Sequence, residues 1–177
     1  MIIREACVDD ASAIARVHVD SWRTTYRGIV PDDYLASLSF ERRERNWQQL
    51  LSQPTERREF IYVAELEPGQ VIGFATGGKE RSNHPIYKGE LYTIYLLQNY
   101  QRLRIGHQLT LAIKNQFAEA NIYSMLVWVL ADNSACHFYE ALGGQKIGEQ
   151  PITIGGATLK EIAYGWMDTR VIPKMPE

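Results

Sequence analysis

The chain has 177 residues, of which 45% are hydrophobic and 23% are charged. This length and this apolar content favour one globular domain with a sizeable core and exclude a disordered chain. Because 19 Lys and Arg residues are balanced by 21 Asp and Glu residues, the net charge of −2 leaves no positive surplus for binding nucleic acid. We expect a single domain over residues 1–170, followed by a short tail over residues 171–177.

Several features predict a cytoplasmic protein without membrane segments or metal. Charged side chains already occur within residues 1–5, so these residues form no signal-peptide core. No apolar run approaches the ~20 residues that a membrane-spanning helix needs. Cys7 and Cys136 are too few to form a disulfide framework. The four histidines show no paired ligand spacing, so we expect no metal site.

The first half of the chain is predicted to be mostly helical. After a short strand at residues 2–6, apolar residues recur every three or four positions over 11–26, which is typical of an amphipathic helix. Gly28 ends this helix, and a second helical stretch runs from residue 31 through an arginine-rich segment to residue 51. His18 lies on the apolar face of the first helix, and we expect it to be a core histidine.

The second half alternates strands with two helices. The predicted strands cover residues 60–64, 71–76, 90–96, 124–130, 152–154 and 159–166. One predicted helix begins after residue 104, and a second covers residues 135–142. This order predicts an α/β (α+β) fold with a mixed, mostly antiparallel sheet. One crossover helix separates strand 90–96 from strand 124–130, so these two strands are expected to run parallel.

The turn after strand 90–96 is a candidate anion site. Ligands favour the carboxyl ends of parallel strands, and the first turn of a helix offers unpaired N–H groups to an anion. Arg102 and Arg104 add two positive charges at this corner. Two arginines in a loop are also compatible with ordinary solvated charges, and only their coincidence with the helix terminus and the parallel strands favours an anion site.

Two motifs in this half resemble the GCN5-related N-acetyltransferases (GNATs). The family pattern Gln/Arg-x-x-Gly-x-Gly/Ala opens a helix after a strand, and Gln101 and Gly106 match it, whereas Arg104 stands at the usual middle glycine. Five residues of a second family segment match further along, namely Asn133, Ala135, Phe138, Tyr139 and Gly143. With residues 21–32, which are similar to a branch of the family, the resemblance covers nearly the whole chain.

The resemblance implies the GNAT fold, with helices on both faces of the sheet and a central pair of parallel strands splayed apart to hold acetyl-CoA as co-substrate. Unpaired backbone groups of Ile94 and Leu96 would receive the pantetheine arm, and the turn would hold the pyrophosphate. The implied cofactor-binding residues are Ile94, Leu96, Gln101, Arg102, Leu103, Arg104, Ile105, Gly106, His107, Asn133 and Ala135. Arg104 must either avoid a positive φ or be strained, because it lacks the freedom of glycine.

The resemblance also implies catalytic and acceptor residues. Tyr139 matches the tyrosine that serves as general acid toward the thiolate. Glu90 stands at the frequent position of the general base, and a solvent-facing strand carboxylate is an equally good interpretation of it. The first helices wall the acceptor cleft in this family, so Arg23, Tyr26 and Tyr34 are candidate substrate-binding residues.

These observations predict an enzyme that transfers an acetyl group from acetyl-CoA to a primary amine of a small molecule or a protein, by direct attack in a ternary complex. A non-catalytic CoA- or acyl-CoA-binding module with the same fold stays open, as does an interaction protein that keeps only the fold. The near-neutral charge does not identify the acceptor. Dimers are the commonest assembly, and a homodimer would use the aromatic C-terminal hairpin with Tyr164 and Trp166.

Overall fold

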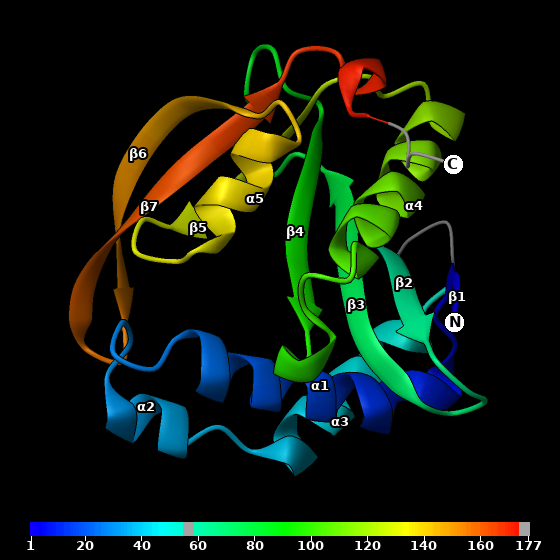
Figure 1. Ribbon diagram of the computed structural model, residues 1–177, viewed down its shortest axis with the longest axis vertical. Coiled ribbons are helices and arrows are strands. Elements are labelled where there is room, and N and C mark those ends of the chain that lie inside the picture. The colour runs from blue at the N-terminus through cyan, green and yellow to red at the C-terminus, as the bar shows by residue number, and fades with distance from the viewer. Residues whose placement is uncertain (55–58, 174–177) are drawn as a thin grey trace.

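The computed structural model describes residues 1–54 and 59–173, which form one seven-stranded sheet with helices on both faces (Figure 1). The strands are β1 Ile2–Glu5, β2 Phe60–Glu65, β3 Val71–Lys79, β4 Gly89–Leu96, β5 Met125–Leu130, β6 Gln145–Ile154 and β7 Ala157–Trp166. The helices are α1 Ala11–Thr25, α2 Asp32–Ala36, α3 Phe40–Leu51, α4 Ile105–Glu119 and α5 Ala135–Ala141. No helix in this described part of the chain is long and apolar enough to cross a membrane.

The sheet has the strand order β1-β2-β3-β4-β5-β7-β6, and only β4 and β5 run parallel. Apolar side chains of α4 and α5 pack on one face, and those of α1 and α3 pack on the other over β2 and β3 (Figure 1). The mixed, mostly antiparallel sheet that the sequence predicts is therefore confirmed.

Two elements differ from the sequence-based expectation. The predicted helical stretch over residues 31–51 is interrupted between α2 and α3, because the Ser39 hydroxyl caps α3 by accepting the N–H of Arg42 at 3.2 Å. Strand β6 is also longer than the predicted 152–154, since a strand that pairs on one side only tolerates Pro151.

Strands β4 and β5 are paired at one end and apart at the other. Their parallel ladder spans three residue pairs, from Gly89 opposite Met125 to Leu91 opposite Val127. Beyond Leu91, β4 stays paired with β3 while β5 pairs with β7, so the two parallel strands diverge. The predicted splay is confirmed, and it leaves the second half of β4 open on one side.

A bulge on β4 marks the point of divergence. Thr93 lies opposite Thr76 and Leu91 lies opposite Gly77, which leaves Tyr92 as the extra residue. Successive residues of a strand point their backbone groups to alternate sides, so the extra residue inverts the alternation. Leu97 donates its N–H to the carbonyl of Ile72 on β3 at 3.0 Å, a distance typical of a ladder hydrogen bond. The backbone groups of Ile94 and Leu96 consequently face away from β3, toward the gap.

Three residues whose positions the sequence did not settle are buried in the core. His18 is 8% exposed and packs among the rings of Trp22, Trp47, Phe74 and Tyr95, as expected of a core histidine. Burial lowers its pKa to about 3. By contrast, two aromatic side chains of β7 are buried inside the subunit and so cannot supply the expected dimer contact, while the homodimer itself stays a prediction. They are Tyr164 and Trp166.

Candidate active site

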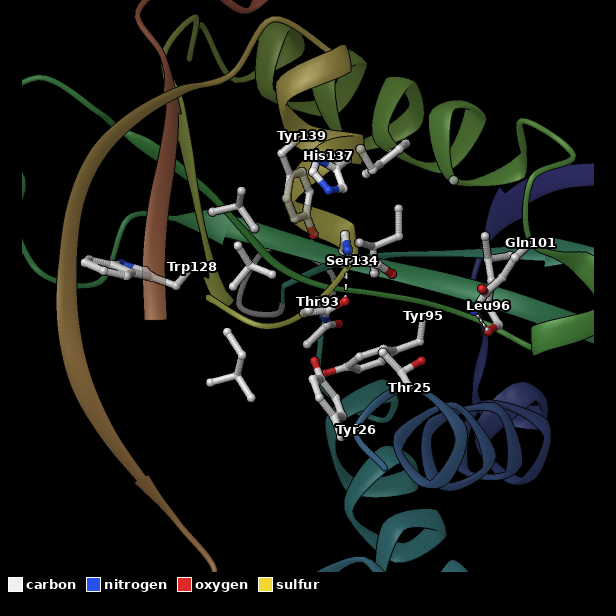
Figure 2. A pocket seen from close by; sticks show the side chains of 18 of the residues that line it. Thr25, Tyr26, Thr93, Tyr95, Leu96, Gln101, Trp128, Ser134, His137 and Tyr139 are labelled. Atoms are coloured by element: carbon white, nitrogen blue, oxygen red, sulfur yellow. Dashed lines mark hydrogen bonds between the residues drawn. The ribbon is translucent and has the colours of Figure 1, made fainter. Parts of the chain in front are cut away.

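A cleft of about 910 Å³ occupies the gap beside the open half of β4. Strand β5 and helix α5 bound it on the other side, the first turn of α4 closes one end, and α1 with the β6–β7 hairpin lines the remainder. Figure 2 shows Gln101 near one end of this cleft and Trp128 near the other, with three tyrosines between them. The cleft therefore follows the divergence of the two parallel strands.

Most of the residues that the sequence predicts for the site line this cleft. They are Tyr139, Ile94, Leu96, Gln101, Arg102, Arg104, Gly106, His107, Asn133, Ala135 and Tyr26. Five predicted residues do not line it, namely Glu90, Leu103, Ile105, Arg23 and Tyr34. The structure thus brings the predicted cofactor residues and Tyr139 together, and it leaves the predicted base outside.

The turn before α4 has an unusual backbone. Arg102 and Arg104 adopt positive φ values of 64° and 62°, in the left-handed region that favours glycine. A residue with a Cβ pays roughly 1–2 kcal/mol to enter this region. Of the two alternatives that the sequence posed for Arg104, the strained one is observed. Both side chains are exposed, and both residues line the cleft at the turn before α4.

The end of β4 differs from the expectation of wholly unpaired backbone groups. The carbonyl of Leu96 accepts hydrogen bonds from the Ser21 hydroxyl at 3.1 Å and from the Gln101 side-chain amide at 3.4 Å (Figure 2). These bonds tie helix α1 and the turn to the strand. The N–H of Leu96 faces the gap, so this group remains available to a ligand in the cleft while the carbonyl is already bonded.

Three tyrosines meet in the middle of the cleft. Tyr139 points its hydroxyl from α5 into this space, and Tyr26 and Tyr95 point theirs from the opposite side (Figure 2). Burial raises the pKa of Tyr26 to about 12, and it raises the pKa values of Tyr95 and Tyr139 well above their ordinary range. All three phenols therefore hold their protons at neutral pH and can act as hydrogen-bond donors.

Asn133 fixes the start of α5 and with it the position of Tyr139. Its side-chain oxygen accepts the N–H of Ala135 at 2.9 Å, and its proximity to Tyr26 partly counteracts the raised pKa of the Tyr26 phenol. Asn133 is 7% exposed. The residue predicted to bind the pantetheine arm is thus held by the backbone at the start of α5 and lines the cleft.

Glu90 lies in the paired half of β4 and is 3% exposed. Its carboxylate accepts the Arg81 main-chain N–H and two guanidinium N–H groups at 3.2, 3.2 and 2.5 Å. The Arg81 guanidinium in turn lies 4.2 Å from the ring centroid of Tyr92. Neither interpretation of Glu90 from the sequence describes this arrangement, since the carboxylate neither faces solvent nor lines the cleft.

Two of the predicted acceptor residues hold the wall rather than line the cleft. Arg23 donates to the carbonyls of Leu35 and Leu38 at 3.4 and 2.9 Å, which anchors the C-terminal end of α2. Tyr34 packs against Gly155 in the β6–β7 turn, where a Cβ would lie 2.7 Å from the tyrosine side chain. Both residues therefore fix the position of α2 beside the hairpin.

The cleft residues that sequence reasoning missed include Tyr95, Trp128 and Glu161. Tyr95 follows the bulge, so its side-chain direction depends on an inserted residue that the alternation pattern does not reveal. Trp128 and Glu161 lie on β5 and β7, and the face on which each side chain emerges depends on the register between the two strands. No distinctive signal in the sequence pointed to Glu161, because Lys160 stands beside it in the same strand.

Comparisons with known proteins agree with this geometry. The model of the acetyltransferase (GNAT) family matches residues 19–144. The uncharacterized N-acetyltransferase YuaI of Bacillus subtilis is 40% identical over 94% of this chain and 92% of its own length. The spermidine N(1)-acetyltransferase of Thermoplasma acidophilum is 24% identical over 82% of this chain and 88% of its length. The chain therefore belongs to the GNAT family of acetyltransferases.

A solved structure shares the fold. The PaiA N-acetyltransferase of Thermoplasma acidophilum in complex with coenzyme A superposes with a TM-score of 0.72, covering 90% of this chain and 96% of that one at 23% identity. The family resemblance found in the two motifs and the GNAT fold expected from it are both confirmed. The roles of individual residues stay predictions.

Proposed function

We propose that this protein transfers an acetyl group from acetyl-CoA to a primary amine, and that the amine attacks the thioester directly while both substrates are bound. The observation that carries the proposal is the Tyr139 hydroxyl, which points into a cleft walled by the open half of β4 (Figure 2). The cleft is large enough for an extended ligand, since small-molecule pockets measure roughly 300–1,000 Å³.

The residues of the cleft fit the chemistry of a CoA thioester. The backbone of Ile94 and the N–H of Leu96 would bind the peptide-like amides of the pantetheine arm as an added strand does. The N–H groups from Gln101 to Gly106, at the start of a 15-residue helix, suit a pyrophosphate. Arg102 and Arg104 add side-chain charge at the same end. Bound acetyl-CoA would supply an activated acyl carbon and a thiolate leaving group.

Leu96 and Tyr139 would stabilise the charges that develop during transfer. The N–H of Leu96 donates to the thioester oxygen as the amine nitrogen bonds to the acyl carbon. When the carbon–sulfur bond breaks, Tyr139 donates its proton to the sulfur. The proton that leaves the attacking nitrogen returns to the Tyr139 oxygen, which balances the charges. The products are the N-acetylated amine and CoA in its thiol form.

We propose further that the amine reaches the cleft in its neutral form. Two imidazoles line the cleft, but His107 contacts the Pro173 carbonyl at 2.7 Å and His137 contacts Glu140 at 3.4 Å. Glu90 is bound to Arg81 outside the cleft, and the cleft carboxylate, Glu161, lies on β7 diagonal to Trp128. A phenol that keeps its own proton at neutral pH is a poor acceptor for an ammonium proton. The pH dependence of transfer would then follow the pKa of the acceptor.

The test is an amine panel incubated with acetyl-CoA, read by thiol release and by the mass gain of one acetyl group. The proposal predicts turnover with at least one primary amine and initial-rate lines that intersect when both substrates are varied. Parallel lines would point to an acetylated enzyme and contradict direct attack. Calorimetric binding of acetyl-CoA without turnover on any amine would instead indicate a non-catalytic CoA-binding module.

A further inference from the structure

The two ends of the cleft carry opposite charge. The end beside α4 holds Arg102 and Arg104 and the N-terminus of the helix. At the other end lies Glu161, which is the single carboxylate among the cleft residues in the described part of the chain. The anionic co-substrate suits the first end, so the second end is left to select the acceptor.

Glu161 lies beside an aromatic ring on the same face of the sheet. On β5 and β7, Leu130 is opposite Glu161 and Trp128 is opposite Ala163, so Trp128 and Glu161 are diagonal neighbours. Side chains in this relation have Cβ atoms roughly 7–8 Å apart, within reach of a long or aromatic side chain. A cation between them would meet a carboxylate on one side and an indole ring on the other. Figure 2 shows Trp128 at the end of the cleft remote from Gln101.

The Glu161 carboxylate is held in place yet keeps acceptor capacity. Its Oε1 accepts the side-chain amide of Gln150 on β6 at 2.7 Å. Its Oε2 has no hydrogen-bond donor within residues 1–54 and 59–173. Between this carboxylate and the tyrosines, the cleft wall is apolar, with side chains from β5 and the β6–β7 hairpin. They include Leu130, Ile152 and Ile154.

We propose that the acceptor is a diamine or polyamine, in which an alkyl spacer separates the amine that is acetylated from a second ammonium group bound by Glu161 and Trp128. This proposal rests on the proposed acetyl transfer. The apolar wall suits the spacer, the carboxylate suits the ammonium, and the tyrosines receive the neutral amine at the other end of the molecule. Glu161 is then a specificity-determining residue that takes no part in the bond changes.

The test compares amines that differ in the second charge alone. Wild-type protein is assayed with 1,4-diaminobutane and with n-pentylamine, its uncharged-end analogue, and then with longer diamines to find the favoured spacer. We expect kcat/KM to be about tenfold or more higher for the favoured diamine, because only the diamine can form a charge-assisted hydrogen bond with Glu161. Equal kcat/KM values for diamine and monoamine would overturn the proposal.

Glu161→Gln removes the charge while it keeps the shape of the side chain. We expect KM for the diamine to rise about tenfold, with KM for n-pentylamine and the calorimetric Kd of CoA unchanged. Glu149→Gln is the matched control, because Glu149 lies on neighbouring β6 outside this cleft and pairs with Lys146 and Lys160. A similar loss in both variants, or a loss for both amines, would contradict a specific role of Glu161.

A binding measurement separates this proposal from the proposed function. Calorimetry of 1,4-diaminobutane against the CoA-bound protein reports the second ammonium site without any turnover. If no amine is acetylated but diamine binding still depends on Glu161, acetyl transfer fails and the cation site stands. If amines are acetylated without any preference for a second charge, the cation site fails and acetyl transfer stands.

Discussion

The two halves of β4 are consecutive in sequence but differ in what pairs with them. From Gly89 to Leu91 the strand is paired on both sides, and its charged residue, Glu90, is buried against Arg81. From Thr93 to Leu96 it is paired on one side only, and its backbone faces the cleft. The comparison teaches that one inserted residue, Tyr92, divides a structural half from a half available to a ligand.

The largest effect is expected at the open half, from Tyr139→Phe. Loss of the hydroxyl removes the proton donor to the sulfur, so kcat should fall by roughly 10²–10⁴-fold, while the calorimetric Kd of acetyl-CoA stays the same. Tyr164→Phe is the matched control, since Tyr164 donates its hydroxyl to Glu140 at 2.7 Å and does not line the cleft. Equal kcat values for the wild type and Tyr139→Phe would remove Tyr139 as the acid.

A different kind of loss is expected in the paired half. Glu90→Gln weakens the buried bonds to Arg81 and should lower the free energy of unfolding by roughly 1.5–3 kcal/mol, as measured by urea denaturation. Because Glu90 does not line the cleft, the pH–rate profile should keep its shape. A variant of unchanged stability whose alkaline-rising limb has vanished would restore Glu90 as the general base.

Burial of His18 on α1 predicts that the free energy of unfolding depends on pH. The pKa of His18 is about 3 in the folded protein and about 6.5 in the unfolded chain, so the unfolded state binds the extra proton between these values. Stability is therefore present above pH 6.5 and is lost as the pH falls, by about 2 kcal/mol at pH 5. His18→Leu should flatten this part of the curve of unfolding free energy against pH. The same slope in both proteins would assign it to other groups.

The smallest effects are expected from Arg104→Gly, and they have opposite signs. Glycine relieves the left-handed strain, so the ligand-free protein should gain about 1 kcal/mol of stability. Loss of the guanidinium should weaken CoA binding about threefold to tenfold. Arg104→Ala keeps the strain but removes the charge, and it should weaken binding without gaining stability. If both variants bind CoA as the wild type does, the Arg104 side chain takes no part.

Much of this comparison was accessible from the sequence. The order of strands and helices, the parallel pair and its splay follow from the crossover helix and from the two motifs around Gln101 and Asn133. The bulge at Tyr92 was not accessible, because the residues of β4 do not alternate regularly between polar and apolar, so an inserted residue leaves no mark in the pattern. This is why Tyr95 was not expected in the cleft, whereas Glu90 was expected near the chemistry because the family resemblance places the general base at its position. Glu161 was missed because its direction depends on the β5–β7 register.

Amide hydrogen exchange, followed residue by residue with NMR, tests the central claim most directly. The account predicts that saturating CoA slows exchange of the Ile94 and Leu96 N–H groups, which face the cleft, and leaves the already paired Leu91 N–H unchanged. Calorimetric binding of CoA with no change in exchange at Ile94 and Leu96 would contradict the claim that the open half of β4 receives the ligand.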